Sequence, residues 1–115
     1  LTAPNRFLFD RIDARIKQRL DGGLLSEIDR LLLKYRFSDP GLNCLAYKEF
    51  SPYFLKKDPR VFDSCLRQWQ KDEHAYARRQ KIYHRRFTKA VFFDISQTPC
   101  QKIVDYVVRW YNKPC

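Results

Sequence analysis

The stretch between Pro59 and Pro99 contains neither glycine nor proline, and most of it repeats with the spacing of an α-helix. Asp58 stands before Pro59 as a start signal, because Asp caps free amide groups and the first helical position does not need the N–H that proline lacks. Residues 58–89 are predicted to be helical, and from Arg60 the pattern keeps helical spacing for about seven turns, roughly 40 Å at 1.5 Å per residue. The rest of the chain must then be organised around this rod.

The predicted helix over residues 58–89 has two contrasting faces. One is apolar and aromatic: Phe62, Cys65, Leu66, Trp69, Tyr76 and Tyr83. The other steps by three and four residues, and we call it the cationic stripe: Arg67, Lys71, His74, Arg78, Lys81 and Arg85.

The charge balance of this helix favours a polyanionic partner. Residues 59–89 carry nine Lys and Arg against three acids, so nine minus three gives +6 of the chain's net +10. Charge runs are usually solvated faces, but a face made only for solubility mixes both signs. The excess therefore favours contact with nucleic-acid phosphates. A membrane surface is disfavoured because the apolar face lacks a long Leu and Phe stripe.

Length and composition set outer limits on the fold. A chain of 115 residues with 44% hydrophobic content is one globular domain or part of one. No run of 18 apolar residues predicts a membrane span, and the first residues lack the apolar core of a signal peptide. We expect a cytoplasmic protein. The start at Leu1, without Met and close to helix signals, predicts entry into the middle of a longer chain.

The four cysteines are spaced 21, 35 and 15 residues apart, and no C-x-x-C occurs, so no zinc pattern is present. Reduced thiols are the expected state, and a disulfide framework is the alternative. Cys44 and Cys65 fall inside apolar helical patterns and are predicted to be small buried side chains.

Three shorter helices are predicted before the long one. Residues 4–20 carry apolar residues every fourth position and stop at two glycines, and residues 24–34 carry a second apolar stripe. A third helix is predicted to begin at Pro40, capped by Asp39, and to run to Pro52, where proline ends or kinks it.

A row of arginines lies beside the apolar stripe of the first predicted helix: Arg11, Arg15 and Arg19. Two interpretations stay open. The row is a solvated edge paired with Asp10 and Asp13, or it is a set of guanidinium donors for phosphate or diphosphate, which arginine binds bidentately.

After the long helix, residues 90–95 form a continuous apolar run that predicts a strand buried on both faces, as in a parallel sheet. One strand cannot satisfy its own backbone groups, so its partners are expected in sequence outside this chain. Thr98 and Gln101 then resemble a capping box, with Pro99 at the first position of a final helix that ends by Pro114.

Four motifs, in order, resemble the bacterial tRNA dimethylallyltransferase family, also called isopentenyl-diphosphate:tRNA transferases. Residues 8–15 are similar to its L-x-x-R-I-x-x-R helix, and residues 23–28 to its G-L-x-x-E-V turn and helix. Residues 45–49 resemble I-G-Y-K/R-E/Q, and residues 76–80 resemble Y-A-K-R-Q. The resemblance covers nearly all of residues 1–95 and corresponds to the C-terminal part of such an enzyme.

This chain departs from the family pattern at several positions. Ala46 stands where the family has glycine, and Asn43 where it has Gln or Arg. Its Thr-Arg pair falls on Glu73 and His74, and its Trp-Phe-Arg falls on residues 83–85.

The resemblance implies a transferase that moves a dimethylallyl group from dimethylallyl diphosphate to N6 of the adenosine 3′ to the tRNA anticodon. It implies an α/β fold, with a P-loop-type parallel sheet and helical parts that bind the anticodon stem-loop. The full-length family enzyme uses Mg²⁺ and is monomeric. The P-loop and the general base lie in its N-terminal part, so we expect this chain alone to be inactive and to bind no metal; its three glycines cannot build a phosphate loop.

The family's site residues carry over to positions on three predicted helices. Arg15 corresponds to the arginine that reaches the diphosphate. Tyr47 and Lys48 of the Y-K-E segment, with Arg78, Arg79 and Gln80 of the K-R-Q segment, fall on the tRNA side. To these the charge pattern adds further predicted tRNA contacts: Arg67, Lys71, Lys81 and Arg85.

We therefore predict a mostly α-helical chain with one short strand. Residues 1–89 form a helical segment with the basic tRNA-facing helix at 58–89. Residues 90–115 form a strand and helix that return to an α/β core whose remainder lies elsewhere. The alternative is a stand-alone, non-catalytic helical RNA-binding module, and a third class is a domain that docks an acidic protein.

Overall fold

The computed structural model describes residues 1–113, which form an elongated, mostly helical body of 58 × 30 × 27 Å. Its longest element is α4 (Phe62–His84), preceded by the 3₁₀ turn η3 (Pro59–Val61). The predicted start is confirmed, because the Asp58 carboxylate accepts the backbone N–H of Arg60. The predicted end at residue 89 is wrong: the helix stops at His84, and i→i+3 bonds from Arg86 and Phe87 tighten the turn that follows.

Two helices before α4 confirm the sequence prediction within two residues. Helix α1 (Asn5–Asp21) ends at Gly22, and α2 (Leu24–Leu32) begins directly after Gly23. Gly23 has φ 95°, a left-handed conformation that glycine adopts without steric cost and that turns the chain between the helices.

The single helix predicted from Pro40 to Pro52 is wrong. The chain instead forms two 3₁₀ turns, η1 (Pro40–Leu42) and η2 (Lys48–Phe50), followed by α3 (Ser51–Lys56). Ala46 lies between the turns with φ 82°, which no right-handed helix accommodates. Pro52 sits in the first turn of α3, where its missing N–H is harmless, so it begins a helix and does not end one.

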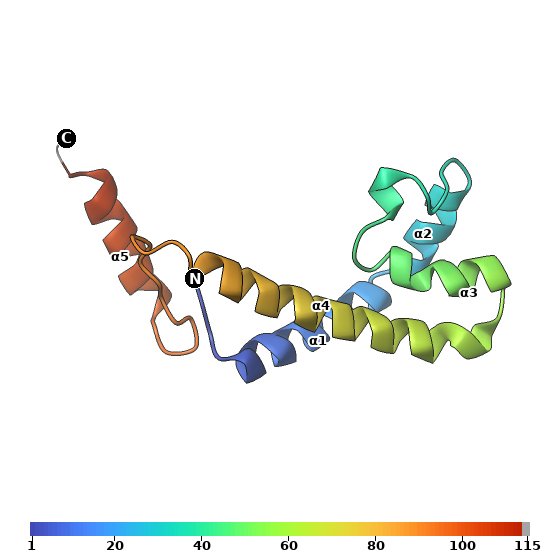
Figure 1. The fold of residues 1–115 in the computed structure, drawn as a ribbon, viewed down its shortest axis with the longest axis horizontal. Helices are drawn as coiled ribbons and strands as arrows, with labels where there is room; N and C mark the ends of the chain where they lie inside the picture. The colour runs from blue at the N-terminus through green and yellow to red at the C-terminus, as the bar shows by residue number, and fades with distance from the viewer. Residues whose placement is uncertain (114–115) are drawn as a thin grey trace.

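The core lies where α1, α2, η2 and the first half of α4 meet, at the right of Figure 1. Its four largest fully buried side chains are Trp69, Phe50, Ile16 and Ile28. The rings of Phe50 and Trp69 meet edge to face, with centroids 5.9 Å apart. The apolar face predicted for α4 is therefore real over its first half, whereas Tyr76 and Tyr83 in its second half are exposed.

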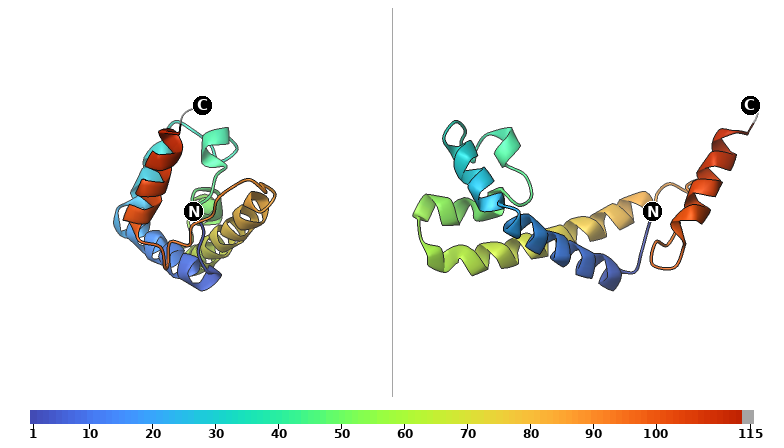
Figure 2. Two further views of the ribbon diagram at one scale, coloured as in Figure 1. Left: turned by 90° about the vertical axis from the view of Figure 1, so that its left-hand side faces the viewer. Right: turned by 180° about the vertical axis from the view of Figure 1, so that it is seen from behind.

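The C-terminal segment stands apart from this core, at the opposite end of the molecule (Figures 1 and 2). Residues 90–95 are not a buried strand, since Val91 and Phe92 are exposed. Their pairing was also predicted wrongly, because Thr2 of the same chain forms a parallel bridge with Asp94. The Thr2 N–H donates to the Phe93 carbonyl at 2.8 Å, and the Ile95 N–H donates to the Thr2 carbonyl at 2.9 Å. Within residues 1–113 this bridge does not extend into a sheet.

The last helix, α5 (Cys100–Tyr111), forms as predicted, but without the predicted side-chain cap from Thr98. No side chain of α5 is buried, and Phe93 meets it through Tyr106, with ring centroids 5.2 Å apart. The predicted limit at Pro114 falls outside the described residues.

The cysteines described by the structure are free thiols. Cys65 is buried in the core as predicted, but Cys44 is exposed, because the helix in which it was placed does not form. Its thiol donates to the Gly41 carbonyl at 3.3 Å. Cys115 lies outside the described residues.

Candidate functional site

The cationic stripe divides into two groups once α1 is packed against α4. The His74 ring stacks on Phe9 at 4.2 Å between centroids, and its Nε2 lies 2.9 Å from Asp13 Oδ1. The Arg78 guanidinium also lies over the Phe9 ring, 5.5 Å from its centroid. Lys81 Nζ donates to the Ala3 carbonyl and to Asn5 Oδ1, both at 2.8 Å. These three side chains therefore hold the two helices together.

Arg78 is exposed although it packs over Phe9. The other exposed members of the stripe are Arg67, Lys71 and Arg85, and Arg79 of the neighbouring face is exposed as well. Across residues 1–113, no carboxylate lies within ion-pair distance of any of the four. An unpaired guanidinium or ammonium in solvent keeps its donors free for an anion. We call Arg67, Lys71, Arg79 and the C-cap residue Arg85 the free cations of α4.

Arg15, predicted to reach a diphosphate, is held by a buried carboxylate. Its Nη2 lies 3.2 Å from Oε2 of Glu73, a residue only 6% exposed, and the other Glu73 oxygen accepts the Trp69 indole N–H at 3.1 Å. Arg15 itself is more than half exposed, so donors remain on its outer side. With Arg11 it lines a hollow of about 540 Å³ on α1. The arginine row is thus paired with neither Asp10 nor Asp13, because Asp13 contacts His74, and Arg15 is not fully free because it pairs with Glu73.

Tyr47 and Lys48, the predicted tRNA contacts before α3, each lie close to a carboxylate. The Tyr47 hydroxyl donates to Glu27 Oε1 of α2 at 3.1 Å, and burial together with this carboxylate raises the pKa of Tyr47. Lys48 is exposed and lies 3.6 Å from Oε1 of Glu49.

Glu49 is a buried carboxylate with an unusual environment. One oxygen accepts the Ala46 N–H at 2.8 Å, whereas the other is buried without a hydrogen-bond partner. Burial raises the pKa of Glu49, and the nearby carboxyl group of Asp72 raises it further. The hydrogen bond to Ala46 also holds that residue at its left-handed φ.

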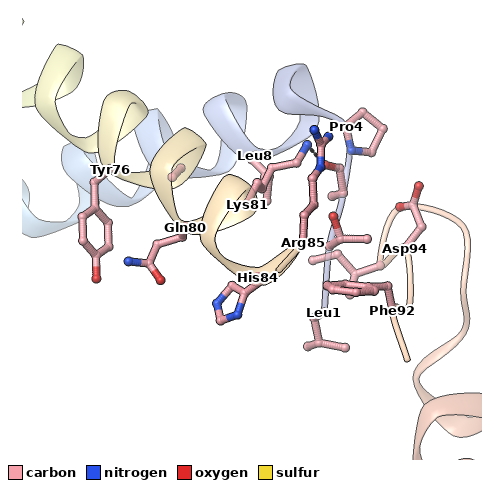
Figure 3. Close-up of a pocket in the computed structure, with 14 residues that line it drawn as sticks. Leu1, Pro4, Leu8, Tyr76, Gln80, Lys81, His84, Arg85, Phe92 and Asp94 are labelled. Atoms are coloured by element: carbon pink, nitrogen blue, oxygen red, sulfur yellow. Dashed lines mark hydrogen bonds between the residues drawn. The ribbon is translucent and has the colours of Figure 1, made fainter. Parts of the chain in front are cut away.

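A cavity of about 800 Å³ lies between the N-terminal residues, the second half of α4 and residues 92–95. Figure 3 shows Tyr76, Gln80 and His84 in a row along one side of α4, while Lys81 and Arg85 reach toward Pro4. Of these, the sequence singled out Gln80, Lys81 and Arg85. It missed Tyr76 and His84 as lining residues, although their spacing of four from Gln80 placed them on one helix face.

Among residues 1–113, no group of three or more His, Cys, Asp and Glu side chains is close enough to hold a metal ion. None of the helices described is both long and apolar enough to cross a membrane.

Comparison with known proteins gives a consistent result. A family model described as IPP transferase matches residues 1–87. A tRNA dimethylallyltransferase of Roseiflexus sp. (strain RS-1) is 35% identical over 111 residues, which span 95% of this chain and 35% of the relative. One of Petrotoga mobilis is 34% identical over 102 residues, covering 88% of this chain and 33% of the relative. The chain thus spans about a third of the length of the curated relatives it matches.

Solved structures share the fold. A tRNA isopentenylpyrophosphate transferase from Staphylococcus epidermidis superposes with a TM-score of 0.87 at 18% identity, over 98% of this chain and 37% of that one. The corresponding full-length enzyme from Bacillus halodurans gives 0.84 at 21% identity, over 96% and 36%. The family model covers most of the chain, and the relatives agree with it. The chain therefore belongs to the IPP transferase family.

Proposed function

We propose that this chain is the tRNA-binding C-terminal segment of a dimethylallyltransferase. The whole enzyme would transfer the dimethylallyl group of dimethylallyl diphosphate to N6 of the adenosine 3′ to the anticodon. Membership of the IPP transferase family supports this, as do relatives named tRNA dimethylallyltransferase. We expect the enzyme to be cytoplasmic and monomeric.

The observation that carries the proposal is the set of free cations on α4. Arg67 and Arg85 are separated by 18 residues, or about 27 Å of helix, and Lys71 and Arg79 lie between them. Cationic heads over this length track several phosphates of an RNA backbone. They carry charge but little base information, so the surface grips an RNA stem without selecting its sequence.

The remaining predicted site residues take secondary parts in this proposal. Tyr47 and Lys48 contact the tRNA from the loop between α2 and α3, and Gln80 does so from the cavity at the second half of α4. Arg78 and Lys81 pack on the N-terminal segment and α1 and orient the two helices. Arg78 stays exposed and adds a phosphate contact beside the free cations, whereas the Lys81 ammonium is held by Ala3 and Asn5.

Arg15 is assigned to the diphosphate. Negative charge develops on diphosphate as it departs, and a fixed guanidinium stabilises that charge. Glu73 holds one side of the Arg15 guanidinium, which leaves its outer donors for the ligand. Mg²⁺ is expected for the whole enzyme, but the described residues offer it no ligand cluster, so we assign it no residue of this chain.

The test of RNA binding is a charge-removal experiment on the chain with unmodified tRNA. Replacing Arg67 and Lys71 by Ala should weaken binding of different tRNAs about equally and flatten the dependence of log affinity on log salt by about one or two units. The matched control removes two exposed cations from α5, Lys102→Ala with Arg109→Ala, and should leave the slope unchanged. Equal effects of the two pairs would refute a localised surface.

The catalytic part of the proposal is tested separately. Incubated alone with dimethylallyl diphosphate, Mg²⁺ and unmodified tRNA, the chain should yield no modified adenosine, because no phosphate-binding glycine loop is encoded in its 115 residues. Product above background would contradict this. If RNA binds but no longer form of the protein transfers the prenyl group, the alternative of a non-catalytic RNA-binding module is correct.

A further inference from the structure

Another cavity, of about 570 Å³, is lined by the end of α2 and the loop that joins α2 to α3. This loop is at the end of the molecule far from α5 (Figure 1). Its walls include Leu31 and Tyr35 at the end of α2, Leu42 of η1, and Tyr47. None of the free cations of α4 lines it, so it is distinct from the surface described above.

The walls of this cavity are fixed by hydrogen bonds. The Tyr35 N–H donates to the Leu31 carbonyl at 2.9 Å, which continues the last turn of α2. The Arg36 N–H donates to Asp39 Oδ2 at 2.8 Å, and the Leu42 N–H donates to the Asp39 carbonyl at 3.0 Å. A cavity built on such constraints is formed before any ligand arrives.

Tyr47 and Tyr35, which both line the cavity, differ in exposure and in the hydrogen bonding of their hydroxyl groups. Tyr47 is partly buried, and its hydroxyl is tied to Glu27, so its ring has little freedom. Tyr35 is 52% exposed, and its hydroxyl makes no hydrogen bond within the described residues. A large aromatic side chain left half in water beside an apolar cavity offers a stacking surface.

Asp39 lines the cavity, and the cations lie beside its two tyrosines in the sequence. Lys34 and Arg36 flank Tyr35, and Lys48 follows Tyr47; all three are exposed. Lys34 and Arg36 have no carboxylate partner within residues 1–113. Aromatic rings interleaved with cations suit single-stranded nucleic acid, whose bases stack while its phosphates meet the positive charge. An aromatic residue of a protein partner would bring no phosphate for these cations.

We propose that this cavity receives one unstacked base from a single-stranded RNA loop, with Tyr35 as the stacking side chain. The flanking phosphates meet Lys34 and Arg36. The inference rests on the proposed function, because it presumes an RNA partner. It adds a second contact, by which the chain distinguishes a looped RNA from a continuous duplex.

The experiment compares two RNA probes binding to the chain by fluorescence anisotropy: a hairpin with a single-stranded loop and a duplex of the same length. Tyr35→Ala should weaken hairpin binding about tenfold to a hundredfold, the scale of one lost base stack. Duplex binding should not change. Tyr35→Phe should bind like the parent, and Tyr35→Leu, which keeps apolar volume without the ring, should behave like Tyr35→Ala. Tyr111→Ala, an exposed tyrosine of α5, is the matched control.

A second readout identifies the base itself. The fluorescent adenine analogue 2-aminopurine is placed at successive loop positions of the hairpin. One position should change in fluorescence on binding the parent or Tyr35→Phe, but not on binding Tyr35→Leu.

The failure of this inference differs from failure of the proposed function. If Tyr35→Leu binds hairpin as well as the parent does, or weakens hairpin and duplex equally, the base site is refuted while RNA binding by α4 stands. If neither probe binds in a salt-dependent way, the proposed function fails first.

Discussion

Helices α4 and α5 are both amphipathic, yet among residues 1–113 only the apolar face of α4 is buried. Trp69 and Cys65 of α4 are fully covered by α1, α2 and η2, whereas Val107 and Trp110 of α5 are at least half exposed. The difference shows that periodicity establishes a helix and its apolar face but not what covers that face. Substitutions in the packed region should therefore lower the free energy of unfolding, whereas substitutions in α5 should leave it nearly unchanged.

The largest expected effect is on the buried indole. Trp69→Ala should lower the free energy of unfolding by about 3–5 kcal/mol, because it removes a large side chain that is fully buried. Val107→Ala in α5 should change it by less than about 0.5 kcal/mol. Urea unfolding followed by circular dichroism measures both. Similar losses of unfolding free energy in the two variants would contradict the difference in packing between α4 and α5.

A smaller effect is expected from the ion pair that joins α1 to α4. Arg15→Ala leaves the buried Glu73 with only the Trp69 N–H, and should cost about 2 kcal/mol, since a buried charged acceptor loses its partner. Solvent around Arg15 limits the loss. Arg15→Lys should recover much of it, and Arg109→Ala in α5 should cost almost nothing. If Arg15→Ala unfolds at the same urea concentration as Arg109→Ala, the pair does not stabilise the packed region.

Glu49 gives a pH-dependent comparison. Burial raises its pKa in the folded state, so its contribution to stability is fully present below the unfolded-state pKa and is lost as pH rises through the folded-state pKa. Glu49→Gln, which carries no charge, should thus be more stable than the parent at neutral pH by about 1 kcal/mol. The advantage should shrink in acid.

Thermal melts of the parent and of Glu49→Gln across that pH range measure the difference. Asp105→Asn on the exposed face of α5 is the control and should show no such trend. A Glu49→Gln advantage that stays constant with pH would mean that Glu49 is not titrating in the folded state.

The smallest expected effect concerns the parallel bridge that ties the two regions together. Thr2→Pro removes the N–H that donates to the Phe93 carbonyl, and should release residues 93–95 at a cost below about 1 kcal/mol. The sensitive measurement is hydrogen exchange at the Ile95 amide, which should lose protection. Thr2→Val keeps the N–H and should preserve it. An unchanged Ile95 exchange rate in Thr2→Pro would show that the bridge is not formed in solution.

Much of the helical framework was predictable from local patterns. The boundaries of α1, the Asp58 cap and the start of the long helix follow from apolar spacing and capping chemistry, which act within a few residues. The region around Ala46 was not, because an alanine gives no local sign of a positive φ. The available signal was the glycine that the resembling family carries at that position.

The candidate site shows the same limit. The spacing of Arg67, His74 and Lys81 placed them on one face of a helix, and that remains true. It could not reveal that α1 crosses this face and engages His74, Arg78 and Lys81, because that crossing depends on contacts with residues about 60 to 80 positions away. Cys44 was misjudged for a related reason, since its burial was inferred from a helix that does not form.

The sequence by itself determined the family, the main helices and the positive charge concentrated on the long one, because these depend on residue identity and spacing along the chain. Only the tertiary structure decided which cations stay free, which carboxylates are buried, and that Thr2 pairs with Asp94. These outcomes depend on helix crossings and on backbone hydrogen bonds between distant segments, and neither leaves a periodic mark in the sequence.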